Sequence, residues 1–110
     1  MTTKQTPRQA KIAGDLATLT TIIEGGLDPN APDKVVALSD GGVVRVGNLT
    51  GSFYSVMPME GNIQRTGVGV HRNPITGRLD PDVGTHHLKV VVQCAYRCAA
   101  RHARWVAEQN

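Results

Sequence analysis

Residues 94–105, CAYRCAARHARW, contain two sets of side chains with ligand-binding chemistry. The first set, Cys94, Cys98 and His102, offers the thiol and imidazole groups that zinc prefers. Its members are four residues apart, so they lie within about 80° of one another around a helix. Structural zinc sites more often use two cysteines separated by two residues, and a buried cysteine often behaves as a small apolar side chain. We therefore expect no metal and no other cofactor, and we assign this set to the core.

The second set consists of Arg97, Arg101 and Arg104, which we call the arginine stripe. The planar guanidinium group matches a phosphate with two parallel hydrogen bonds, so a ridge of arginines can hold a nucleotide or a nucleic-acid backbone. Residues 84–110 carry four Lys or Arg and one Glu, which accounts for the whole net charge of +3. A solvated helix face near a C-terminus is the alternative. The shortage of acids nearby favours phosphate binding.

A second group of polar side chains lies in GVHRNPITGR, residues 69–78. His71, Arg72, Asn73 and Arg78 surround a Pro-Gly turn. Turns at the end of a sheet commonly carry binding residues, although an exposed hairpin tip has the same composition. We expect these side chains to join the arginine stripe if the C-terminal helix packs beside this turn.

Three segments of different periodicity must position these groups. Apolar residues at helical spacing, after Thr6 as a capping residue, predict a helix over 7–24. β-branched runs, the first two joined by an Asp-Gly turn, predict a strand-rich body over 34–79. One strand is expected over 62–70, where closely spaced glycines indicate a bulge or a close approach of two backbones.

The segment 81–109 predicts a long amphipathic C-terminal helix, capped by Asp80 or by Thr85. At 100° per residue, the inner face contains Leu88, Val91, Val92, Ala95, Cys98, Ala99, His102 and Val106. The outer face contains His86, Lys89, Gln93 and the arginine stripe. The fold class is therefore α+β in a single domain, 1–110, with an antiparallel sheet of about four to six strands between two helices. Small residues on the inner helix face suit close packing, so we expect a homodimer or a higher homo-oligomer.

Several classes of protein are disfavoured. No run approaches the roughly 18 apolar residues that a membrane span needs, and the N-terminal residues lack an apolar leader, so we expect a cytoplasmic protein with no membrane partner. The sequence contains no GxSxG, HExxH, Walker or GxGxxG motif. The net charge is small for a protein that depends on the DNA backbone. The enzymatic alternative is a small phosphodiesterase that uses His71, His86 or His87.

The order of the elements, with Arg97 and Arg101 in an Arg-x3-Arg pair, resembles the small phage-encoded counter-defence proteins. It is most like the Thoeris anti-defence sponges, which sequester cyclic-nucleotide signals as homo-oligomers. The resemblance implies phosphate contacts from Arg97 and Arg101, support from the turn at 71–73, and stacking of a base on Phe53 or Tyr54. Anti-CRISPR proteins share the small size and the absence of catalytic motifs.

The sequence therefore predicts a non-enzymatic protein that binds a phosphate-bearing ligand and sequesters a nucleotide or cyclic nucleotide. The arginine stripe supplies the phosphate contacts, and Arg72 or Arg78 assists. The first alternative is a protein that inhibits a nucleic-acid machine through protein–protein contacts, with a protein or nucleic acid as its partner.

Overall fold

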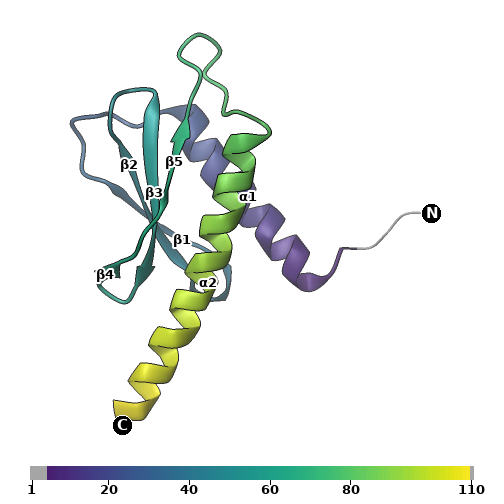
Figure 1. Cartoon of the computed structure of the whole chain (residues 1–110), viewed down its shortest axis with the longest axis vertical. Helices are drawn as coiled ribbons and strands as arrows, with labels where there is room; N and C mark the ends of the chain where they lie inside the picture. Colours follow the sequence, from purple (N-terminus) through teal and green to yellow (C-terminus); the bar gives the residue numbers. More distant parts are fainter. Residues whose placement is uncertain (1–4, 110) are drawn as a thin grey trace.

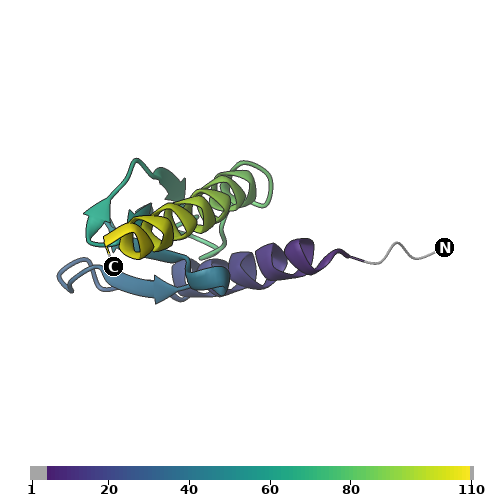
Figure 2. The same cartoon turned by 90° about the horizontal axis from the view of Figure 1, so that it is seen from below.

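The computed structural model describes residues 5–109, in which two helices share one core with a five-stranded antiparallel sheet (Figure 1). The predicted α+β class is confirmed, but both helices pack against one face of the sheet, so the sheet does not lie between them as predicted. In chain order the elements are α1 (Pro7–Gly25), β1 (Lys34–Ala37), a 3-10 turn η1 (Ser39–Gly41), β2 (Val43–Asn48), β3 (Phe53–Glu60), β4 (Ile63–Gln64), β5 (Val68–His71) and α2 (Val83–Gln109). The two helices cross each other beside the strands (Figures 1 and 2).

Helix α1 begins with a complete capping box. The Thr6 hydroxyl accepts from the Gln9 amide at 3.1 Å, and the Gln9 side chain accepts from the Thr6 amide at 2.8 Å. The helix ends at Gly25, and Gly26 follows with a φ of 79° that favours glycine. Both ends were predicted from local sequence signals, within one residue.

The sheet is built around β3. Strands β1, β2 and β3 follow one another as antiparallel neighbours, and β4 and β5 both pair with β3. Side chains along β2 and β3 alternate between buried and half-buried, so one face of the sheet enters the core. The buried face carries Val44, Val46, Tyr54, Val56 and Val70.

The single strand predicted over 62–70 is wrong, because the structure divides it into β4 and β5. Gln64 pairs with Met59, and Val68 pairs with Val56. Between these two pairs, the segment from β4 to β5 has one residue more than β3 does. That extra residue is a bulge. A side chain at Gly67 would collide with the carbonyl oxygen of Val56, so the predicted close approach of backbones is confirmed.

Helix α2 begins at Val83, two residues later than predicted. Asp80 is its cap, since Oδ1 accepts from the amides of Val83 at 2.7 Å and Asp82 at 2.9 Å. The inner face is buried from Leu88 to Cys98, as predicted. Beyond that point Val106 is 41% exposed, because the yellow end of the helix extends past the sheet (Figure 1). The buried inner face of α2 is therefore shorter than the sequence pattern predicted.

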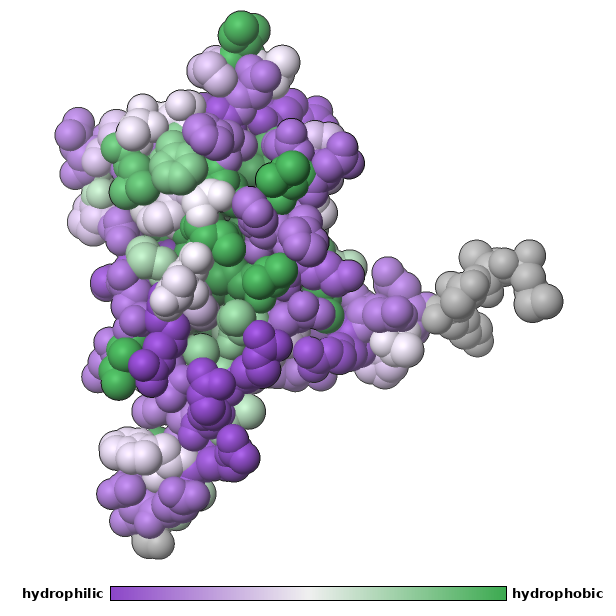
Figure 3. All heavy atoms as spheres, viewed as in Figure 1, coloured by the Kyte–Doolittle hydropathy of each residue, from purple (hydrophilic) through white to green (hydrophobic). Residues whose placement is uncertain are grey.

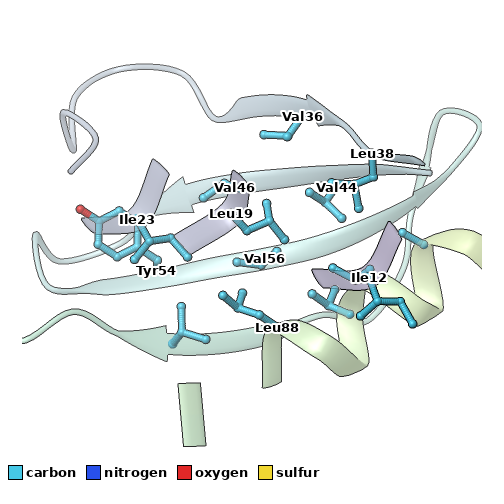
Figure 4. Close-up of a cluster of buried hydrophobic side chains, with 14 of the residues drawn as sticks. Ile12, Leu19, Ile23, Val36, Leu38, Val44, Val46, Tyr54, Val56 and Leu88 are labelled. Atoms are coloured by element: carbon cyan, nitrogen blue, oxygen red, sulfur yellow. The ribbon is translucent and has the colours of Figure 1, made fainter. Parts of the chain in front are cut away.

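One hydrophobic cluster joins α1, the inner face of the sheet and the first half of α2. Figure 4 shows Ile12, Leu19 and Ile23 of α1 directed toward the same strands as Leu88 of α2. Among residues 5–109 no helix has the length and apolar character needed to span a membrane.

Candidate ligand-binding site

The arginine stripe begins at Arg97, past the middle of α2, and continues along the C-terminal part of the helix. Its three members are solvent-exposed, and strongly hydrophilic residues cover this part of the helix on the face seen in Figure 3. They do not share one environment, because Arg97 and Arg101 make contacts with different neighbours.

Arg101 is held by a carboxylate from the sheet. Its Nε and Nη2 donate to Oε1 of Glu60 at 3.0 and 2.7 Å, and Arg65 contacts Oε2 of Glu60 at 3.3 Å. The hydrogen bonds from Arg101 and then Arg65 lower the pKa of Glu60 from 4.5 to about 2. The inference that few acids neutralise the stripe is wrong for Arg101, because its partner lies 41 residues away in the sequence.

Arg97 shares a hollow with an arginine of α1, which no local sequence signal indicates. Arg8, in the first turn of α1, lies over the ring of Tyr96 with its guanidinium carbon 5.8 Å from the ring centroid. Arg8 and Arg97 line one open hollow of about 360 Å³, and the other lining residues are Asp40, Tyr96, Ala99, Ala100 and Ala103. We call this the Arg8–Arg97 hollow. The small side chains that were expected to pack against another element partly line this hollow instead, and Ala103 is exposed.

The charges around this hollow are unbalanced. Lys11 pairs with Asp40 at 2.7 Å, so the one carboxylate among the lining residues already has a cation. Within residues 5–109, Arg8, Arg97 and Arg104 form no ion pair. Arg97 contacts only a sulfur, that of Cys94, at 3.1 Å. Two arginines without a carboxylate partner therefore line the same hollow.

A buried polar network fixes the elements that carry these arginines. The hydroxyl of Tyr96 in α2 donates to Oδ2 of Asp15 in α1. The amide of Ser39 in η1 donates to both oxygens of the same carboxylate, at 3.2 and 3.1 Å. Burial, and then the hydrogen bond to Asp15, raise the pKa of Tyr96 above its ordinary value of 10.0. The Asp15 carboxylate thus joins α1, η1 and α2 beside the Arg8–Arg97 hollow, which Tyr96 lines.

The polar residues of the Pro-Gly turn, which we call the turn cluster, have a structural role at the opposite end of α2; they are His71, Arg72, Asn73 and Arg78. Arg72 Nε donates to the carbonyl oxygen of Glu24 at 3.3 Å, and Arg78 Nε lies 3.3 Å from Oε2 of Glu24. Asn73 Oδ1 accepts from the amides of Ile75 and Thr76 and so closes the turn. His71, Asn73 and Arg78 do line a hollow of about 320 Å³. These contacts fasten the turn to the end of α1.

The turn cluster does not join the arginine stripe. Arg97 follows the first residue of α2 by 14 positions, which corresponds to about 21 Å along the helix axis. The expectation that Arg72 and Arg78 would reach Arg97 is wrong, because the turn precedes α2 and lies beyond its N-terminal end (Figure 1).

The two expected base-stacking residues are not beside the stripe either. Tyr54 is 0% exposed, and its hydroxyl accepts from the Leu27 amide at 3.2 Å, so its ring belongs to the core. Phe53 is half-buried on the other face of the sheet, with its ring centroid 4.7 Å from that of His71. The structure therefore contradicts stacking of a ligand base on Tyr54.

The cysteines and histidines do not converge. Arg97 donates to the sulfur of Cys94 and Arg101 to that of Cys98, which is buried, and burial raises the pKa of the Cys98 thiol. The His102 ring packs against Gly61 and stacks on Trp105. In the described part of the chain no three His, Cys, Asp or Glu side chains are placed to hold a metal ion.

The three histidines of the predicted phosphodiesterase alternative, His71, His86 and His87, do not lie in one site. The rings of His86 and His87 lie 6.1 Å apart in the first turns of α2. His71 lines the hollow beside the turn cluster, and neither His86 nor His87 is among the residues that line it.

Comparison of the chain with protein-family models, curated proteins and solved structures gave no match.

Proposed function

We propose that this protein binds a phosphate-bearing ligand of the nucleotide or cyclic-nucleotide class, without turnover, in the Arg8–Arg97 hollow. The observation that supports this proposal is that one hollow is lined by two arginines, from different helices, that form no ion pair within residues 5–109. Guanidinium groups in such a position can each give a phosphate two parallel hydrogen bonds.

The proposal assigns different roles to the members of the stripe. Arg104 follows Arg97 by two turns, about 10 Å along the helix, and is placed to contact a second phosphate. Arg101 contributes less, because Glu60 already neutralises it. Arg8 replaces it as the partner of Arg97.

Binding without turnover fits the lining of the hollow. The lining contains no histidine and no cysteine, and its carboxylate, Asp40, is paired with Lys11. No lining group is thus free to act as a general base at neutral pH. We propose, following the resemblance to the counter-defence sponges, that binding sequesters a nucleotide signal and that the protein acts as a homo-oligomer. Light scattering of the purified protein measures the number of chains.

The test compares the melting temperature of the wild type with that of Arg8→Gln/Arg97→Gln. Mononucleotides, cyclic nucleotides and dinucleotides are added in turn, with short oligonucleotides alongside. A ligand at a hundredfold excess over its Kd stabilises the folded state by about 2.7 kcal/mol, so binding raises the melting temperature. We expect one nucleotide class to raise it by more for the wild type than for the double variant.

Arg78→Gln is the matched control, because it removes an exposed arginine from the turn cluster. It should keep the ligand-induced shift. No shift with any nucleotide, or an equal shift in the double variant, contradicts the proposal. If a nucleic-acid machine is inhibited and free nucleotide does not compete, the protein–protein alternative is favoured.

A further inference from the structure

A second hollow lies on the other flank of α2, between its last turns and the β3–β4 hairpin. Its volume is about 440 Å³, within the range of small-molecule sites. Glu60, Asn62, Ile63, Arg65, His102 and Trp105 line it. None of these residues lines the Arg8–Arg97 hollow, so the two sites are separate. We call this second site the Trp105 hollow.

The apolar surface of this hollow is a pair of aromatic rings. The imidazole of His102 and the indole of Trp105 stack with centroids 5.9 Å apart and planes inclined by 21°. Trp105 remains 57% exposed, although the protein has only four Phe, Trp or Tyr side chains in all. An exposed indole face beside a hollow can stack on another planar ring.

The hairpin turn fixes the position of the imidazole. Gly61 has a φ of 61°, as the first position of a tight two-residue turn requires. A Cβ at Gly61 would lie 2.6 Å from Cε1 of His102, so only glycine lets the ring pack against the turn. Because the turn holds His102 and His102 stacks on Trp105, the ring surface is preformed.

The opposite side of the hollow combines an apolar wall with a polar edge. Ile63 is 55% exposed and faces the same space. The side-chain amide of Asn62 forms no hydrogen bond within residues 5–109, so its NH2 donors and its carbonyl acceptor are available to a ligand. Arg65 and Glu60 are held by their ion pair at 3.3 Å.

We infer that the Trp105 hollow binds a nucleobase, with the ring stacked on Trp105 and its polar edge toward Asn62. A nucleobase has two apolar faces and a hydrogen-bonding edge, which matches a stacking surface, an aliphatic wall and an unpaired amide. The inference is independent of the proposed phosphate site, because the two hollows share no residue.

Trp105 is the only tryptophan, so its fluorescence reports directly on this hollow. The protein is titrated with adenosine and with uridine, while ribose 5-phosphate serves as a probe that lacks a ring. Excitation at the red edge of indole absorption limits absorption by the base, and calorimetry repeats each titration. We expect saturable quenching by at least one nucleoside and none by ribose 5-phosphate.

Two variants locate the binding. Ile63→Ser removes the aliphatic wall at an exposed position and should weaken nucleoside binding about tenfold or more, with Tm little changed. Arg8→Gln/Arg97→Gln should leave nucleoside quenching unchanged, which separates this inference from the proposed function.

Three results would overturn the inference. The first is the absence of quenching by either nucleoside, and the second is an unchanged affinity in Ile63→Ser. The third is an emission that shifts to shorter wavelength with protein concentration alone, which would assign the hollow to a second copy of the chain.

Discussion

The two halves of α2 have different surroundings. One face of residues 83–98 is buried against the sheet and α1, and the arginines of the neighbouring turn are fastened to Glu24. Residues 99–109 extend past the sheet, and Arg104 there forms no ion pair within residues 5–109. The comparison teaches that the number of arginines does not locate a site. The presence or absence of a carboxylate partner for each arginine does locate it. Mutations along this one helix should therefore separate effects on stability from effects on binding.

The largest difference should come from a matched pair of valines. Val92 is 0% exposed in the first half, and Val106 is 41% exposed in the second. Val92→Ala should lower the free energy of unfolding by about 2.5 kcal/mol, from lost burial plus a cavity. Val106→Ala should change it by less than about 0.5 kcal/mol. Urea denaturation measures both, and equal losses would show that the second half is packed as tightly as the first.

Tyr96 lies near the boundary between the halves. Tyr96→Phe removes the hydrogen bond to Asp15 and should cost about 1.5 kcal/mol of unfolding free energy. The aromatic ring under Arg8 remains, so nucleotide binding in the Arg8–Arg97 hollow should persist.

The same tyrosine predicts a pH dependence. Because its pKa is raised in the folded state, its stabilising effect is complete below pH 10 and is lost as the pH rises above that value. Denaturation curves at alkaline pH should show this loss in the wild type and not in Tyr96→Phe. A parallel loss in both would assign the alkaline transition to other groups.

The smallest effect is expected at Glu60, which joins the sheet to the second half of α2. Its folded-state pKa of about 2 lies below 4.5, so its contribution to stability is present above pH 4.5 and is lost as the pH falls toward 2. Glu60→Gln should lack this acid-dependent loss. It should also free Arg101 and tighten nucleotide binding by about threefold or less. Weaker binding in this variant would show that the ion pair orders the stripe.

Local patterns predicted most of the fold. The capping box at Thr6 and Gln9, the glycines after α1 and the apolar positions of α2 depend on residues a few positions apart, so the sequence displays them directly. The glycines of the strand expected over 62–70 indicated a bulge, but the place where the strand divides depends on the register with β3, which no local pattern displays.

The candidate site was predicted only in part, because its partners come from distant segments. Glu60 is 41 residues from Arg101, and no spacing rule connects them. Nor does any local signal bring Arg8 of α1 beside Arg97 of α2. Asp15 did have a signal, since it lies three residues after Ile12 and four before Leu19 in the apolar stripe. A carboxylate at such a position requires a buried donor, which is Tyr96.

The position of α2 after the sheet has a consequence for synthesis. All five strands leave the ribosome before α2 does, yet the residues that cover their apolar face include Leu88, Val91 and Val92 of α2. The part of the nascent sheet that α2 covers is therefore exposed to solvent and to other chains until α2 emerges. A molecular chaperone that binds apolar strands should contact the nascent chain during this interval and should release it once α2 has docked.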